Sequence, residues 1–234
     1  SDGTRSGTVK NFAEWGCAGG MVLHIATNAH QQTSVNRFAV ENQGDGLYCF
    51  GSVYPYAENA IEAMGEIKEA GLHGIKLHPD YQEFFIGDEA ALPIYAEAEK
   101  LGLPVAFHTG RDPLSPNLIH CPPDVLGKIA DLFPRLTIIA AHMGGMDLPE
   151  EAAKHLADKP NVYFDTAFAS HFLDVARFTE LVKLRGADHV LFATDSPWST
   201  LPAEKALLDA ADLTPAEKEA IAWKNAEELF GISI

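Results

Sequence analysis

Cysteine is scarce in this chain of 234 residues, and its three cysteines, Cys17, Cys49 and Cys121, lie far apart. Their odd number and wide spacing argue against a disulfide framework and against a cysteine-based zinc site. Reduced thiols are the simpler interpretation, and they predict a cytoplasmic protein. No apolar run approaches the roughly 18 residues that a membrane helix needs, so no membrane partner is expected.

Positive charge is scarce as well. The chain has 17 lysines and arginines against 33 aspartates and glutamates, which gives a formal net charge of −16. This balance excludes nucleic acid and anionic membranes as the main partners. Hydrophobic residues make up 47% of the sequence, enough to bury a real core. We therefore expect a globular protein with a small-molecule partner, and the sequence leaves open whether it forms a homodimer.

A glycine-rich phosphate loop is also absent, since Ala26–His30, after the first strand-like segment, contains no glycine. This absence argues against an open doubly wound sheet. Apolar, strand-like segments alternate with amphipathic, helix-like ones, which predicts a parallel sheet. No linker interrupts the order, so residues 1–234 are expected to form one (β/α)8 barrel domain of the TIM type. The expected strands are Met21–Thr27, Leu47–Pro55, Gly74–Pro79, Pro104–Gly110, Leu136–Gly145, Val162–Ala167 and Val190–Trp198.

The expected helices lie between and around these strands. They are Thr8–Trp15, Glu58–Leu72, Asp88–Gly102, Asp124–Phe133, Glu150–Leu156, Leu173–Leu184, Ala203–Leu208 and Thr214–Phe230. Seven strands are one fewer than a closed barrel needs. We therefore expect the first strand to lie upstream of Ser1, which would make the domain N-terminally incomplete. An open or seven-stranded barrel is the alternative.

Three of the strands end on residues that bind metals. His108, His142 and Asp195 each close an apolar run, and a glycine or proline turn follows each of them. Barrel enzymes build their active sites at these strand ends. Two imidazoles and a carboxylate would hold a divalent metal and activate a water molecule. We expect zinc, with manganese as the alternative, and we expect Asp195 and His142 to act in catalysis as well.

Side chains alternate between the two faces of a strand, so the residue two positions before a ligand shares its face. This rule turns Ala106 inward with His108, and Ile138 and Ala140 inward with His142. It also turns Leu191 and Ala193 inward with Asp195. On the third strand it turns Lys76 and His78 inward.

Four further residues are candidate substrate contacts near the strand ends. Lys76 offers a buried ammonium, and His78 lies beside it at the end of the same strand. Arg111 could bind a carboxylate with its planar guanidinium, and Trp198 could form a wall of the pocket.

Several segments resemble a known family, the amidohydrolase-related metal-dependent hydrolases. This branch of the amidohydrolase superfamily also contains the aminocarboxymuconate-semialdehyde decarboxylase group. The similar segments are Gly-Ile-Lys-Leu-His-Pro (74–79), Val-Ala-Phe-His-Thr-Gly (105–110), Ile-Ile-Ala-Ala-His-Met-Gly-Gly (138–145), Tyr-Phe-Asp-Thr (163–166), Ala-Thr-Asp-Ser-Pro-Trp (193–198) and Trp-Lys-Asn-Ala-Glu-Glu-Leu-Phe-Gly (223–231).

The resemblance implies a (β/α)8 barrel with a His-x-His pair on the first strand. It also implies a histidine ending the fifth strand, a histidine ending the sixth and an aspartate ending the eighth. His108, His142 and Asp195 match the last three, but the chain has no His-x-His. This departure predicts weak or altered metal binding, and therefore low activity, for this chain alone.

Four functions stay open. The first is metal-dependent hydrolysis of a small amide, lactone or ester, with Asp195 taking the proton from water and His142 stabilising charge. The second is non-oxidative decarboxylation of an aromatic or unsaturated acid. The third is a metal-free barrel scaffold. An iron-dependent oxygenase ranks last, because we see no close His-x-Asp pair beside the three ligands.

Overall fold

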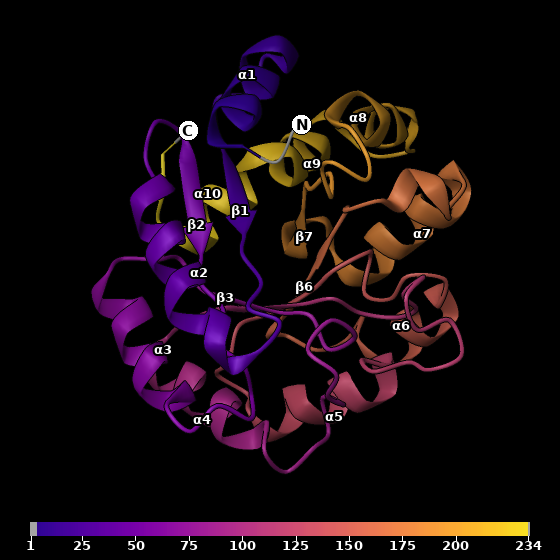
Figure 1. Ribbon diagram of the computed structural model, residues 1–234. Coiled ribbons are helices and arrows are strands. Elements are labelled where there is room, and N and C mark those ends of the chain that lie inside the picture. The colour runs from indigo at the N-terminus through magenta and orange to yellow at the C-terminus, as the bar shows by residue number, and fades with distance from the viewer. Residues whose placement is uncertain (1–3, 234) are drawn as a thin grey trace.

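The computed structural model describes residues 4–233 and contains an α/β fold with parallel strands (Figure 1). Within these residues all seven expected strands form, each shorter than predicted. Most of the remainder of each predicted segment is loop at the strand's carboxyl end. The strands are β1 (Gly20–Leu23), β2 (Leu47–Phe50), β3 (Ile75–Leu77), β4 (Val105–Phe107), β5 (Ile138–Ala140), β6 (Val162–Asp165) and β7 (Val190–Leu191).

The strands follow one another around the barrel in sequence order. β1 pairs with β2, and β3 to β7 form a second parallel sheet. A single parallel bridge between Gly51 and Ile75 joins the two sheets. Within residues 4–233 no strand pairing connects β7 to β1, so the barrel wall is open there. The first strand of the barrel, which we expect upstream of Ser1, stays a prediction.

Helices surround the strands as an outer ring, while α1 lies at the top of the view beside β1 (Figure 1). Every predicted helix is present, with ends shifted by a few residues. The helices are α1 (Arg5–Trp15), α2 (Ala29–Asn42), α3 (Ala60–Glu69), α4 (Leu92–Leu101), α5 (Pro123–Leu132), α6 (Pro149–His155), α7 (Val175–Arg185), α8 (Leu201–Ala210), α9 (Pro215–Glu219) and α10 (Asn225–Phe230).

Helix α2 is the one that the sequence did not predict. It buries only Gln32 and Ala39, so it lacks the apolar stripe that marks an amphipathic helix. Its start is nevertheless defined, because the Asn28 side chain accepts a hydrogen bond from the backbone N–H of Gln31.

The C-terminal segment closes one end of the barrel. Thr214 and Glu217 form a capping box at the start of α9. A wider π-helical turn, Ala220–Lys224, then leads into α10. The Asn225 side chain donates to the carbonyls of Ala187 and Val190, which ties this helix to β7.

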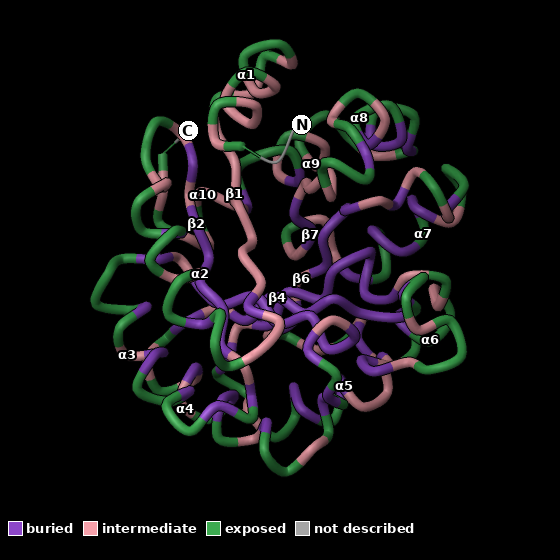
Figure 2. The backbone as a smooth tube through the Cα atoms, viewed as in Figure 1, coloured by how far each residue is buried: buried purple, intermediate pink, exposed green. Residues whose placement is uncertain are grey.

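Two apolar clusters form the core. The larger one lies between the strands and the outer helices, and the burial view shows it as buried backbone inside an exposed outer surface (Figure 2). The smaller one fills the barrel interior and consists of Phe50, Ala106, Ile139 and Leu191, with Phe230 of α10 packed against them. Burying a side chain of this size contributes about 1.5–3 kcal/mol.

The interior cluster corrects one sequence prediction. Ala106 and Leu191 face inward as expected, but Ile139 faces inward on β5 in place of Ile138 and Ala140. Ile139 is also the register partner of Ala106. The alternation fails because His142 has a left-handed backbone with φ of 60°, so the chain is no longer extended when it reaches the ligand.

Candidate active site

His108 and His142 meet at the carboxyl ends of β4 and β5. The Nδ1 atom of His108 lies 3.0 Å from the Nε2 atom of His142, and both residues are buried. Each outer nitrogen faces a backbone carbonyl. Nε2 of His108 lies 3.1 Å from the oxygen of Arg111, and Nδ1 of His142 lies 2.9 Å from the oxygen of Ala167. The first two predicted ligands are therefore brought together.

The protons of this pair follow from its partners. Carbonyl oxygens only accept, so Nε2 of His108 and Nδ1 of His142 must both carry hydrogen to satisfy them. Two neutral rings have no further hydrogen, which leaves the lone pairs of the two inner nitrogens facing each other. The pair therefore suits either one extra proton or a cation. The pKa of His108 is well below its usual range, mainly because the ring is buried. The charges of His142, His78 and Lys76 lower this pKa further.

Asp165, at the end of β6, fixes the backbone of His142. Its Oδ1 atom accepts hydrogen bonds from the backbone N–H groups of His142 and Ala167 at 2.9 and 3.1 Å. Burial raises the pKa of Asp165, while His142 and Lys76 act in the opposite direction. This carboxylate therefore positions the left-handed turn that carries the histidine.

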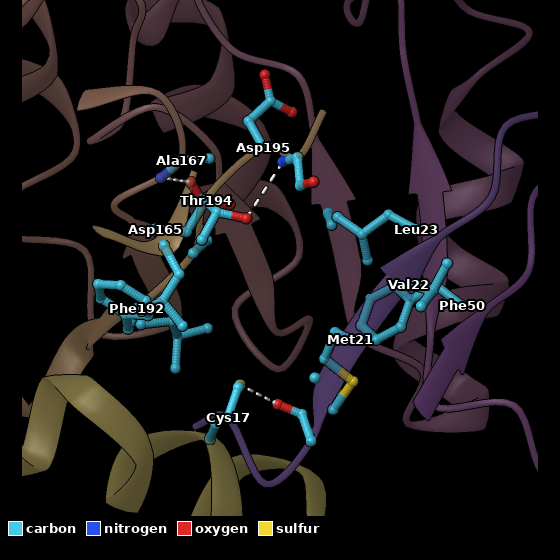
Figure 3. A pocket seen from close by; sticks show the side chains of 18 of the residues that line it. Cys17, Met21, Val22, Leu23, Phe50, Asp165, Ala167, Phe192, Thr194 and Asp195 are labelled. Carbon is cyan, nitrogen blue, oxygen red and sulfur yellow. Dashed lines mark hydrogen bonds between the residues drawn. The ribbon is translucent and has the colours of Figure 1, made fainter. Parts of the chain in front are cut away.

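A cavity of about 370 Å³ extends from this turn into the barrel. Met21, Leu23 and Phe50 line one side, and Phe192 lines the opposite side (Figure 3). The charged residues of its lining are Lys76, Asp165 and Asp195, which come with His142 from the strands and the loops that follow them. The cavity is therefore largely apolar with one charged end, an arrangement that is common in small-molecule sites.

Asp195, the third predicted ligand, is one of the lining residues in Figure 3. His142 lines the same cavity. Its backbone is left-handed, with φ of 59°. Among the described residues, its carboxylate forms no hydrogen bond or ion pair with His108 or His142. The structure thus brings two of the predicted ligands into contact and puts the third on the wall of the same cavity.

Lys76 of β3 also lines this cavity and is only 6% exposed. Burial lowers the pKa of Lys76, and the nearby carboxylates of Asp165 and Asp195 raise it. Lys76 forms no ion pair with any residue between 4 and 233. A buried ammonium that faces a cavity without a bound carboxylate is suited to hold an anion.

The other predicted substrate contacts lie outside the cavity lining. The His78 ring is buried and stacks on His108, with ring centroids 4.2 Å apart. Arg111 is exposed, and its guanidinium donates to the carbonyl of Pro116. Trp198 is 69% exposed. Substrate binding by these three residues stays a prediction.

Sequence analysis missed a buried acidic group beside the two stacked histidines. Asp112 Oδ2 lies 3.8 Å from Nε2 of His78 and 3.6 Å from Nε2 of His108. Asp80 Oδ2 lies 3.9 Å from the same nitrogen of His108. A signal was available, since His78-Pro79-Asp80 is a His-x-Asp sequence. The prediction that no His-x-Asp pair lies close to the three ligands is therefore wrong.

Comparison with protein families identifies the chain. Residues 19–232 match the family model described as amidohydrolase. The chain belongs to the amidohydrolase family. A comparison with curated proteins found no match. The resemblance inferred from the sequence segments is therefore confirmed at the level of the family.

Solved structures share the fold of this amidohydrolase-family chain at low sequence identity. A TIM-barrel protein from Bordetella bronchiseptica is 23% identical, with a TM-score of 0.80 over 96% of this chain and 81% of that one. The 2,6-dihydroxybenzoate decarboxylase from Rhizobium is 19% identical, with a TM-score of 0.76 over 96% and 87% of the two chains. A dihydroxybenzoic acid decarboxylase from Polaromonas, solved with manganese and 2-nitroresorcinol, is 16% identical, with a TM-score of 0.74 over 97% and 86%.

These similarities confirm the TIM-barrel fold of the amidohydrolase-family chain. Several of the similar structures are decarboxylases, and the one from Polaromonas contains bound manganese. None of the helices that the structure describes is long and apolar enough to cross a membrane.

Proposed function

We propose that this chain carries the active site of a metal-dependent, non-oxidative decarboxylase of a small aromatic carboxylic acid. The observation that supports it most is the unpaired, buried ammonium of Lys76 at the charged end of an otherwise apolar cavity. An aromatic acid matches this cavity, because it combines an apolar ring with one anionic group. The decarboxylases among the similar structures support the same choice over a hydrolase.

The cavity would hold such a substrate in one orientation. Phe50, Leu23 and Phe192 would contact the ring, since they form the apolar walls. Lys76 would pair with the carboxylate in a space that holds little water, where charge interactions are strong. Met21 and Leu191 would limit how far the ring can enter.

A divalent metal fits the histidine end of this cavity. The facing nitrogens of His108 and His142 are available as ligands, because each outer nitrogen donates to a carbonyl, as metal-binding histidines commonly do. Asp195 would supply the carboxylate ligand. When bound, the metal would add a positive charge that attracts the oxygen atoms of the acid. Zinc suits two imidazoles and a carboxylate, and manganese is the alternative.

The chemical step requires a proton at the ring carbon. That carbon gains a proton, its bond to the carboxyl carbon then breaks, and the bonding electrons return to the ring as carbon dioxide leaves. Asp195 would transfer the proton, because its carboxylate lies on the cavity and forms no hydrogen bond with the two site histidines. Asp165 would keep His142 in position through its two backbone contacts.

The test compares one lysine variant with one arginine variant in an assay that measures carbon dioxide release from hydroxybenzoates. Lys76→Met should raise KM at least tenfold, because it removes the cation from the cavity. Arg111→Met is the matched control, since it removes an exposed cation that does not line the cavity. Carbon dioxide release that is unaffected by Lys76→Met but reduced by Arg111→Met would contradict the proposed substrate orientation.

Hydrolysis of a small lactone, amide or ester is the second candidate. The position of Asp195 also favours it, since the same carboxylate could take a proton from an attacking water. Assaying a panel of lactones and amides beside the aromatic acids separates the two reactions. If neither class is turned over and the purified protein contains no metal, a metal-free scaffold becomes the better explanation.

Two further proposals concern the protein as a whole. All three cysteines are free, which supports a cytoplasmic location. Whether the protein forms a homodimer can be measured by light scattering.

A further inference from the structure

We propose that the loops after β3 and β4 form a second divalent-metal site, separate from the cavity. Its ligands are Nε2 of His78, Nε2 of His108, Oδ2 of Asp112 and Oδ2 of Asp80. His108 is the ligand that this site shares with the metal site proposed at the cavity. None of the four residues is part of the cavity lining.

The geometry supports a common ion. The ligand atoms of His78, His108 and Asp112 all lie within 4.8 Å of one another. Two of their separations are 3.6 and 3.8 Å. Ligands around a tetrahedral zinc lie about 3.4 Å apart, given bond lengths near 2.1 Å. The separations of 3.6 and 3.8 Å are therefore within a few tenths of an ångström of coordination spacing, and the two histidine nitrogens lie within 4.8 Å of each other.

Asp80 provides an independent observation. Its side chain is fully buried, and its Oδ2 atom has no hydrogen-bond partner. This orphaned oxygen lies 3.9 Å from Nε2 of His108 and thus points into the cluster. Its other oxygen, Oδ1, is held by Nδ1 of His120 at 2.8 Å and by the hydroxyl of Ser115. A buried carboxylate oxygen without a donor is costly unless a cation or proton satisfies it.

The charges of the cluster also suit a cation. His78 is buried, and its Nε2 atom faces Oδ2 of Asp112 at 3.8 Å, so an ion between them would be held by one imidazole and one carboxylate. Two neutral imidazoles and two carboxylates are ligands of the zinc, cobalt and iron class rather than of calcium. The ring of Tyr81 stacks on His78 at a centroid distance of 3.6 Å and covers it.

His108 belongs to both sites through different nitrogens. Nδ1 faces His142 and the cavity, whereas Nε2 faces Asp112 and Asp80. A neutral imidazole has one free lone pair, so it can serve only one of the two metals at a time. Binding a metal at Nε2 requires the hydrogen to move to Nδ1, which then donates to Nε2 of His142, while the contact to the Arg111 carbonyl is given up. The remaining ligands of each site are distinct, and this makes the two sites separable by mutation.

The experiment measures Co²⁺ binding to the chelator-treated chain by equilibrium dialysis and by the visible absorption of the bound ion. Asp112→Asn should weaken binding at the second site at least tenfold and should change the absorption spectrum. Asp195→Asn, the matched control in the cavity, should leave this binding within about twofold. The melting temperature of each metal-free variant verifies that it has folded.

Two results would overturn the proposal. One is Co²⁺ binding that is unchanged in Asp112→Asn but lost in Asp195→Asn. That result would assign the bound ion to the cavity site alone. The other is no Co²⁺ binding by the unmodified chain. If Asp112→Asn does not fold, Asp80→Asn replaces it, because its amide oxygen can keep the contacts to His120 and Ser115 while the Oδ2 ligand is lost.

Discussion

The carboxylate of Asp165 holds the backbone of His142 from the neighbouring strand. One oxygen accepts both the N–H of His142 and the N–H of Ala167, whose own carbonyl faces the His142 ring. Asp165 thus acts on the site through His142 and is a positioning residue. The left-handed turn at His142 depends on this support.

Replacing Asp165 should therefore affect both stability and turnover. Asp165→Ala leaves two buried N–H groups without an acceptor, and we expect the free energy of unfolding to fall by about 1–3 kcal/mol. We also expect kcat to fall by roughly 10–100-fold, as for other groups that orient metal-binding histidines. Urea unfolding and steady-state kinetics measure the two effects. Asp165→Asn keeps an acceptor oxygen and should recover most of the stability; a variant as unstable as alanine would argue against this role.

Asp195→Asn should abolish most of the reaction without unfolding the chain. The side chain lies on the cavity and forms no hydrogen bond with the site histidines, so little packing is lost. Removing a group that transfers a proton typically lowers kcat by 10²–10⁴-fold. Product formation and the melting temperature should be recorded on the same sample. Normal turnover in this variant would remove Asp195 from the mechanism.

Gly144 should not tolerate a side chain. Its φ is +82°, and an added Cβ would lie 2.6 Å from the ring of buried Phe164. We expect Gly144→Ala to destabilise the protein by at least about 1 kcal/mol. Gly65→Ala is the matched control, because Gly65 lies inside α3 and an added Cβ there meets no atom within 4 Å. That change should stabilise the chain by about 0.5–1 kcal/mol. Thermal unfolding of the two variants should give shifts of opposite sign.

Stability should fall in mild acid partly because of His24. Burial lowers the pKa of this imidazole below 6.5, although its hydrogen bonds to Phe50 and Val22 oppose the shift. Between the lowered pKa and 6.5 the unfolded chain binds more protons at His24, so the free energy of unfolding rises with pH in that interval. His24→Asn should flatten this part of the curve. Melting temperatures of both proteins between pH 5 and pH 7.5 provide the comparison, and identical slopes would exclude a contribution from His24.

The sequence predicted the order of the barrel because its signals are local. Apolar runs marked all seven strands, and amphipathic stretches marked most of the helices. Helix α2 was missed, since its buried face is only Gln32 and Ala39. The strand-end rule also predicted that His108 and His142 lie together, and their rings are in contact; their role in metal binding stays a prediction. These successes rest on periodicity and on turns, both of which can be read within a few residues.

The parts that failed depend on tertiary contacts. The inward side of β5 was wrong because the left-handed backbone of His142 interrupts the alternation. Asp112 lies in a loop, where side-chain direction follows no period, so its approach to His78 and His108 could not be predicted. Asp80 lies in a loop as well, but the His-x-Asp sequence at 78–80 was a local signal for it. The positions of Arg111 and Trp198 outside the cavity lining were equally beyond a one-dimensional pattern.

The interruption between β7 and β1 is partly covered by the C-terminal segment. The backbone N–H of Phe192 donates to the carbonyl of Ile221, and the Asn225 side chain donates to the carbonyl of Val190. Phe230 at the end of the same segment packs against Phe50 in the barrel interior. A substitution that loosens this segment would therefore disturb the apolar wall of the cavity as well as the edge of β7.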